Sequence, residues 1–302
     1  MEMLHYDFMQ RAFCAGGIIA LIASALGVYL LLRRQALMAD MLSHVSLAGV
    51  AAGAYLRINP SITGFIVAII GAIAVEYVRK AYKTYSELSV AIIMVGGLSV
   101  SIILMTMNKT INKSFSSYLF GSVVAVNQLE LTMMLAAALI GALFFFLLRK
   151  PLYIISFDEE SARTSGIPVQ WISVGFSIIT GMIVAAAMPI VGVLLVSSLI
   201  ILPAALSVRI APSFTSAILV SMGIGLTGTF TGLTASYELS TPPGGTIAFI
   251  LLLFLVSGLC VRKIILLASK STSKKMRPEI AVKESRISKN GLSSNLQKIR
   301  QR

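Results

Sequence analysis

The sequence predicts an all-α polytopic membrane protein with about nine transmembrane helices, within a range of eight to ten. The chain of 302 residues is 57% hydrophobic and only 12% charged, whereas a soluble domain carries roughly 25% charged residues. The charges that remain lie in short gaps between long apolar runs and at the C-terminus. Each run is long enough for a helix to cross about 30 Å of hydrocarbon, so the pattern indicates repeated bilayer spans.

Nine apolar stretches are expected to form these spans. They lie at roughly 13–32, 36–56, 61–79, 88–107, 129–148, 171–188, 190–208, 213–235 and 245–261. Pro189 falls between the sixth and seventh stretches, and Pro203 falls inside the seventh, where proline frees a carbonyl and kinks a helix. Gly49 and Gly53 are four residues apart, a spacing that lets two helices approach closely.

Basic residues occur in every second gap, which sets the expected orientation. The gaps contain Arg33 and Arg34, then Arg79, Lys80 and Lys83, then Arg149 and Lys150, then Arg209, and finally Arg262 and Lys263. Because cytoplasmic loops carry an excess of Lys and Arg, we expect an outside N-terminus and an inside C-terminus. Lys109 and Lys113 are exceptions on the other side.

Two regions are expected, a transmembrane domain over residues 1–261 and a basic, disordered cytoplasmic tail over residues 262–302. Of the net charge of +13, most lies in the tail, which has twelve Lys and Arg residues against Glu279 and Glu284. Its polar, Ser-rich composition is typical of disorder. This location argues against nucleic-acid binding and favours either contact with anionic membrane lipid or a solvated tail without a partner. The two cysteines offer no disulfide framework.

Asp40 and His44 are the candidate metal ligands. They are four residues apart in the second stretch, so both side chains emerge on one face of a helix. His44 is about 15 Å from Arg34 along the helix, near the middle of the bilayer. Imidazole nitrogen and carboxylate oxygen together suit divalent metals such as zinc or manganese. Glu76, by contrast, is expected to pair with a neighbouring cation such as Arg79.

The metal role has a plain alternative, in which Asp40 and His44 bond to one another or to Ser43 and Ser46. Two ligands are also too few for a metal site in one chain. A two-fold dimer around a pore would supply two Asp and two His residues, and a sparse site would let a transported ion leave.

The longest hydrophilic segment between spans is predicted to contain a short cytoplasmic helix. Asp158, Glu159 and Glu160 suit a helix N-terminus, while Gly166 can end the helix and Pro168 blocks its continuation. The alternative is an ordinary loop.

The chain is not expected to be an enzyme. It contains no phosphate-binding G-x-x-x-x-G-K-[ST] loop, so the energy for transport must come from a partner protein or an ion gradient. No cofactor is expected, since a metal bound at Asp40 and His44 would be a transported substrate.

The sequence resembles the ABC-3 family, the permeases of bacterial zinc and manganese ABC importers, over about residues 7–261. The segments that carry the resemblance are LLRRQALMADMLSHVSLAGVAAG (31–53), SSYLFGSVVAV (116–126), SFDEESARTSGI (156–167) and VGVLLVSSLIILPAALSVRIA (191–211). The first is the most specific, because the family pattern is a Gly/Ala-Asp-x-x-x-His run that opens the second span.

The resemblance implies a type II ABC importer-like permease in the bacterial plasma membrane. It implies a homodimer, a cytoplasmic ATPase subunit on each copy, and an extracellular metal-binding lipoprotein that delivers the ion. It also implies that Asp40 and His44 contact the metal. The segment from Asp158 to Gly166 then resembles the coupling helix, with Glu159, Ala162 and Gly166 contacting the ATPase.

Within this family the Ser-Leu-Ala-Gly-Val version of the motif resembles the zinc branch more than the manganese branch. Ala39 stands where many members have Gly, and Ala48 where manganese-type members often have Pro. A manganese or iron importer of the same family is the alternative. The other classes that we consider are a stand-alone secondary transporter, which would carry inverted repeats, and a membrane enzyme, which would need more convergent polar groups.

Overall fold

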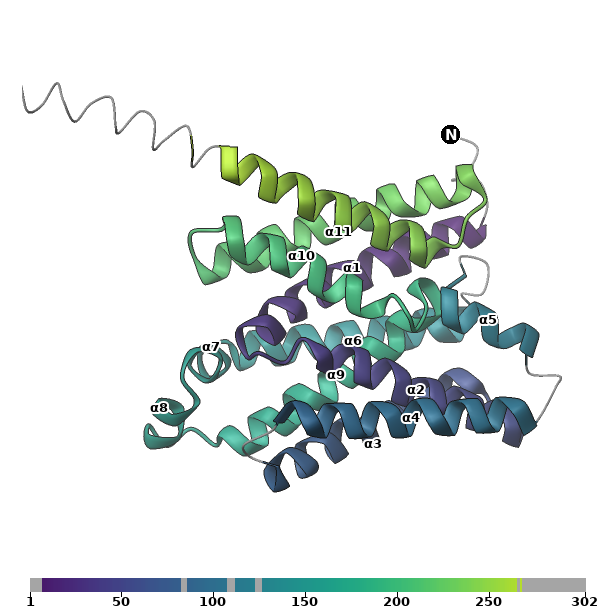
Figure 1. The fold of residues 1–302 in the computed structure, drawn as a ribbon, viewed down its shortest axis with the longest axis horizontal. Coiled ribbons are helices and arrows are strands. Elements are labelled where there is room, and N and C mark those ends of the chain that lie inside the picture. Colours follow the sequence, from purple (N-terminus) through teal and green to yellow (C-terminus); the bar gives the residue numbers. More distant parts are fainter. Residues whose placement is uncertain (1–6, 83–85, 108–111, 123–126, 265–266, 268–302) are drawn as a thin grey trace, which may run out of the picture. The chain divides into compact units, whose positions relative to one another are not determined.

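The computed structural model describes residues 7–82, 86–107, 112–122, 127–264 and 267. Within these ranges the chain consists of helices joined by short turns and contains no strand, which confirms the all-α prediction. The helices are α1 (Asp7–Leu32), α2 (Leu37–Leu56), α3 (Pro60–Ala81), α4 (Ser86–Met107), α5 (Asn112–Phe120), α6 (Gln128–Leu147), α7 (Arg149–Phe157), α8 (Glu159–Thr164), α9 (Val169–Val191), α10 (Val196–Ile210) and α11 (Phe214–Leu239), as Figure 1 shows, followed by a last helix at Pro243–Ile264.

The chain divides into two units, residues 1–255 and residues 256–302. All packing described below is that of the first unit. Almost all of the predicted tail, 262–302, lies outside the described residues, so its disorder stays a prediction.

Eight of the described helices are long and apolar enough to cross a membrane: α1, α2, α3, α4, α6, α9, α11 and the last helix. The ninth predicted span is the shorter helix α10, which has 15 residues. Its expected bounds, 190–208, are wrong at the start, because α9 continues through Pro189 to Val191 and α10 begins only at Val196. Gly192, with a φ of 83°, ends α9, a conformation that glycine adopts without steric cost.

The interior of the first unit is formed by α1, α2 and α9. In the most apolar window of α9, 83% of the residues are buried, whereas only 11% are buried in α4. A helix of apolar residues that buries few of them within the protein is suited to face lipid. α2 packs against α3, α4, α9 and α10, so its polar residues lie within a helix bundle.

Small residues bring α2 and α3 into close contact, as the spacing of Gly49 and Gly53 predicts. A Cβ atom added to Gly49 would lie 2.7 Å from the carbonyl oxygen of Thr63, and one added to Gly53 would overlap the Thr63 hydroxyl. Ser46 continues this contact, since its hydroxyl donates a hydrogen bond to the Gly64 carbonyl at 3.1 Å.

The end of α9 and the turn that follows it are joined by backbone hydrogen bonds to the end of α5 and the residues after it. The amide of Val193 donates to the Tyr118 carbonyl at 2.9 Å, and the amide of Ser122 donates to the Pro189 carbonyl at 3.0 Å. The positive-inside rule assigns this end of the bundle to the extracellular side. The turn between α9 and α10 is therefore held in place by α5.

Two short helices were not predicted, α5 and α7. α7 follows α6 directly and contains the basic pair Arg149 and Lys150, which the sequence reading had placed in a gap. It buries Leu152 and Ile155 and leaves its polar side exposed, as an interfacial amphipathic helix does.

Candidate metal site and cytoplasmic cavity

Asp40 and His44 lie on the first half of α2, one helical turn apart. Both residues are partly buried. Leu37 precedes Asp40 by three residues and His44 by seven, so Leu37, Asp40 and His44 form one stripe along the helix. The structure thus brings the two predicted ligands to one face of an enclosed helix.

The hydrogen bonds around Asp40 and His44 differ from the alternative in which the two side chains bond to one another or to Ser43 and Ser46. The Ser43 hydroxyl donates to the backbone carbonyl of Asp40 at 2.7 Å, and Ser46 bonds to Gly64, so neither serine is bonded to His44. Nδ1 of His44 is covered and has no hydrogen-bond partner among the described residues. The Asp40 carboxylate accepts from the Ser197 hydroxyl of α10 at 3.5 Å.

In the tautomer that has its proton on Nε2, a buried Nδ1 without a partner offers its lone pair to a ligand. Within the described part of the chain, no group of three or more His, Cys, Asp and Glu residues is arranged to hold a metal ion. In the described part of one copy, Asp40 and His44 are therefore two candidate ligands rather than a group of three or more.

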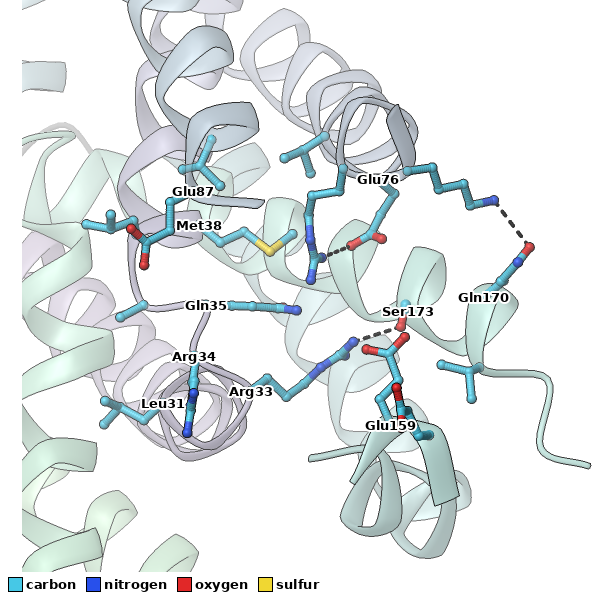
Figure 2. A pocket seen from close by; sticks show the side chains of 18 of the residues that line it. Leu31, Arg33, Arg34, Gln35, Met38, Glu76, Glu87, Glu159, Gln170 and Ser173 are labelled. Carbon is cyan, nitrogen blue, oxygen red and sulfur yellow. Dashed lines mark hydrogen bonds and ion pairs between the residues drawn. The ribbon is translucent and has the colours of Figure 1, made fainter. Parts of the chain in front are cut away.

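A cavity of about 990 Å³ lies at the end of the bundle that the positive-inside rule assigns to the cytoplasm. The cavity is lined by the ends of α1 and α3, the starts of α2, α4 and α9, and helix α8 (Figure 2). Leu37 and Met38 line it at the start of α2. The stripe of Leu37, Asp40 and His44 therefore begins at the cavity wall.

The cavity wall carries charges of both signs. The cations are Arg33, Arg34, Arg79, Lys80 and Arg163, and the anions are Glu76, Glu87, Glu159 and Glu160.

Arg33 reaches across the cavity from the end of α1 to α9 (Figure 2). Its guanidinium donates to the Ser173 hydroxyl at 2.7 Å and lies 4.6 Å from the centroid of the Phe176 ring. Burial, together with the nearby charge of Arg79, lowers the pKa of Arg33 from its ordinary value to about 10, while Glu76 and Glu159 oppose this shift. Arg33 therefore remains a cation at neutral pH.

Glu76 pairs with Arg79, which confirms the expected structural role. Its carboxylate accepts from Arg79 at 2.7 Å and from the Ser177 hydroxyl at 2.6 Å. Ser173 and Ser177 are four residues apart on α9, so one face of α9 binds both Arg33 and Glu76. These contacts fasten the cytoplasmic ends of α1 and α3 to α9.

Helix α8 confirms the predicted short helix between the fifth and sixth spans. The Asp158 side chain caps it by accepting from the amides of Glu160 and Ser161 at 3.0 and 3.1 Å. The hydrogen bonds from the Ser161 hydroxyl and amide hold the pKa of Asp158 below its ordinary value. Glu159 pairs with Arg163 at 2.7 Å on the exposed side of the helix.

The C-terminal end of α8 depends on Gly166, which has a φ of 78°. The amide of Ile167 donates to the Ala162 carbonyl at 3.2 Å, and the amide of Gly166 donates to the Arg163 carbonyl at 3.1 Å. This pair of bonds is a Schellman motif, which favours glycine at the left-handed position.

The three residues expected to contact an ATPase differ in their surroundings. Glu159 and Gly166 are exposed, and a side chain added at Gly166 would meet open space. Ala162 is fully buried in the core. The Ala162 side chain therefore anchors α8 to the bundle and presents no surface in this chain.

The sequence reading missed a buried carboxylate at the opposite end of the bundle. Glu130, on α6, accepts from the Ser61 hydroxyl at 2.7 Å, and Ser61 is in turn 3.1 Å from the Tyr118 hydroxyl. Glu130 also completes the capping box of Asn127. The sequence signal was an Asn-x-x-Glu pattern at the start of an apolar run.

Comparisons with known proteins can be set beside this geometry. A family model described as "ABC 3 transport family" matches residues 5–262. A "Probable metal transport system membrane protein" of Treponema pallidum is 32% identical, covering 82% of this chain and 93% of that protein. The "Manganese import system permease protein ScaB" of Streptococcus gordonii is 29% identical, covering 85% of this chain and 93% of that one.

A solved structure titled "PsaBC from Streptococcus pneumoniae in complex with Fab" has the same fold. The match has a TM-score of 0.76 at 26% sequence identity, and covers 85% of this chain and 92% of that chain.

Proposed function

This chain belongs to the ABC 3 transport family, and from that membership we propose that it is the membrane permease of an ATP-driven importer of a divalent transition metal. The proposal has this chain form the path for the ion, while a separate cytoplasmic ATPase supplies the energy. An extracellular metal-binding lipoprotein delivers the ion to the outer end.

The observation that carries the proposal is the state of His44. Its Nδ1 is buried without a hydrogen-bond partner in the described chain, and the Asp40 carboxylate lies one turn away on the same face of α2. Imidazole and carboxylate are common ligands of zinc and manganese. We assign Asp40 and His44 as the residues that contact the passing ion.

The remaining ligands come from a second copy of the chain. Two protomers related by a two-fold axis would contribute two Asp40 and two His44 side chains, enough for four-coordination of zinc. A site assembled between subunits can open when the subunits move, which lets the ion leave toward the cytoplasm. The cavity beside Leu37 supports an exit on that side.

The ATPase docks on α8. The helix is exposed on the side of Glu159 and at Gly166, and the buried Ala162 ties it to the core. If the ATPase displaced α8, the helices that pack against Ala162 and the start of α9 would therefore move with it.

Zinc is the metal that we propose, with manganese or iron as the alternative within the same family. The SLAGV segment after His44 supports zinc, whereas the name of the Streptococcus gordonii relative refers to manganese. Asp and His ligands do not separate these metals strongly.

Growth of a deletion strain in chelated medium tests the function and the metal together. The strain should fail to grow until zinc is added, and should regain growth in chelated medium when it carries this chain on a plasmid. Rescue of the deletion strain by manganese alone would replace zinc by manganese in the proposal. Equal growth of deletion and parent strains at every chelator concentration would contradict metal import.

A further inference from the structure

Ser197 is the residue that connects the candidate metal site to α10. Its hydroxyl donates to Oδ1 of Asp40 at 3.5 Å across the contact between α10 and α2. We propose that Ser197 is a positioning residue, which holds the Asp40 carboxylate in the orientation that binds the transported metal. This inference rests on the proposed function, in which Asp40 is a metal ligand.

The direction of the Ser197 side chain is unusual for a helical serine. Serine hydroxyls within helices commonly bond to a carbonyl one turn back in their own helix. The neighbouring Ser198 does so, donating to the Leu195 carbonyl at 2.6 Å, and Ser207 likewise donates to Ala204 at 3.0 Å. Ser197 instead points at a carboxylate 157 residues away in sequence.

The turn between α9 and α10 determines where Ser197 lies along the bundle, beside Asp40 of α2. α9 ends at Val191, and Gly192 turns the chain so that α10 starts at Val196. Ser197 therefore lies in the first turn of a 15-residue helix, where the positive end of the helix dipole also favours a nearby carboxylate.

Among the described residues the Ser197 hydroxyl bonds to Oδ1 of Asp40, which leaves Oδ2 available to a metal ion. Ligating carboxylates are generally held by such an outer hydrogen bond, and loss of the outer partner typically weakens metal binding by about 10- to 100-fold. A carboxylate without this outer hydrogen bond rotates among more orientations. Metal binding then has to order the side chain, and the lost conformational entropy weakens the affinity.

The turn directly before α10, at residues 192–195, is bonded to α5. The Val193 amide donates to the Tyr118 carbonyl and the Leu194 amide to the Leu119 carbonyl, at 2.9 and 3.4 Å. A displacement of α5 at the extracellular end would therefore move the first turn of α10, and with it the hydroxyl that holds Asp40.

The test is metal uptake by the complete transporter, reconstituted in lipid vesicles with its ATPase and binding protein. Initial rates are measured against zinc concentration for Ser197→Ala, Ser197→Thr and the matched control Ser198→Ala. We expect Ser197→Ala to raise the KM for zinc about tenfold or more. Ser197→Thr keeps the hydroxyl and should have a KM close to that of the original chain. The KM of Ser198→Ala should stay within about twofold of the original value. A KM for Ser197→Ala equal to that of Ser198→Ala would overturn the assignment, as would a loss of maximal rate and thermal stability with KM unchanged.

Asp40→Asn in the same vesicles separates this inference from the function on which it rests. If Asp40→Asn abolishes uptake while Ser197→Ala behaves like Ser198→Ala, the positioning role fails and the metal path stands. If Asp40→Asn transports normally, the metal path itself fails. Combining the two substitutions should be no worse than Asp40→Asn alone, because the serine acts through the carboxylate.

Discussion

At the scale of single residues, the buried polar side chains differ in whether the protein supplies their partners. Glu76 accepts from Arg79 and Ser177, and Glu130 accepts from Ser61. Nδ1 of His44 is covered without a partner among the described residues, a situation that costs about 1–3 kcal/mol. The other buried polar atoms in this state are three hydroxyl oxygens and Nη1 of Arg33, which are not usual ligands of zinc or manganese. His44 is therefore the residue that a metal ion would satisfy.

Removal of the Glu76 carboxylate should destabilise the bundle more than removal of an exposed ion-pair partner. Glu76→Ala leaves Arg79 and Ser177 without their acceptor in a largely buried place, and we expect a loss of about 1–3 kcal/mol. Thermal unfolding of the purified protein in detergent measures this loss.

Arg163→Ala is the matched control for that measurement. It breaks the Glu159–Arg163 pair, whose side chains are about half exposed, and such pairs contribute at most about 1 kcal/mol. Equal unfolding temperatures for the two variants would show that the Glu76 network does not fasten α3 to α9.

At the scale of elements, the least predictable feature is the turn between α9 and α10. The sequence shows an unbroken apolar stretch around Pro189, and the expected boundary was placed at the proline. In the structure Pro189 lies in the last turn of α9, and its carbonyl accepts from the Ser122 amide. The boundary is set three residues later by Gly192 and by contact with residues 118–122, which are about 70 residues away in sequence. Local propensity cannot report such a contact.

Gly192→Ala should disrupt this turn. An added Cβ would overlap the backbone of Leu119 and Gly121, and alanine is strained at a φ of 83°, at a cost of at least about 1–2 kcal/mol. We expect a lower unfolding temperature and reduced metal uptake. Gly223→Ala on α11 is the control, since its Cβ meets open space and alanine favours a helix. If Gly192→Ala were as stable and as active as Gly223→Ala, the turn would have no role in holding α10.

Substitutions at Gly166 separate the backbone role of this residue from its proposed role in docking. Gly166→Asn keeps the left-handed conformation that asparagine tolerates, whereas Gly166→Arg adds a long cation at the exposed end of α8. We expect Gly166→Arg to uncouple ATP hydrolysis from uptake and to weaken co-purification of the ATPase, and Gly166→Asn to retain most of both. Unchanged ATPase binding and transport in Gly166→Arg would defeat the docking assignment.

At the scale of the whole molecule, hydrophobic length predicted most of the fold. The membrane fixes how many apolar residues a span needs, so eight long helices could be marked to within a few residues at most of their ends. The spacing of Asp40 and His44 predicted that they share a face. Helix α7, the burial of Ala162 and the reach of Ser197 to Asp40 could not be predicted, because each depends on which helix packs beside which.

The central claim is that Asp40 and His44 contact the ion as it passes. The most direct test is zinc uptake into vesicles that contain the reconstituted transporter with either His44→Ala or Asp40→Asn. Co-purification of the ATPase and the dimeric state are checked for each variant, and Ser46→Ala on the same helix serves as the control, because its hydroxyl bonds to Gly64. We expect both ligand variants to assemble normally and to lose uptake by about tenfold or more, while Ser46→Ala transports zinc. Uptake by His44→Ala at the rate of the original chain would contradict the metal path.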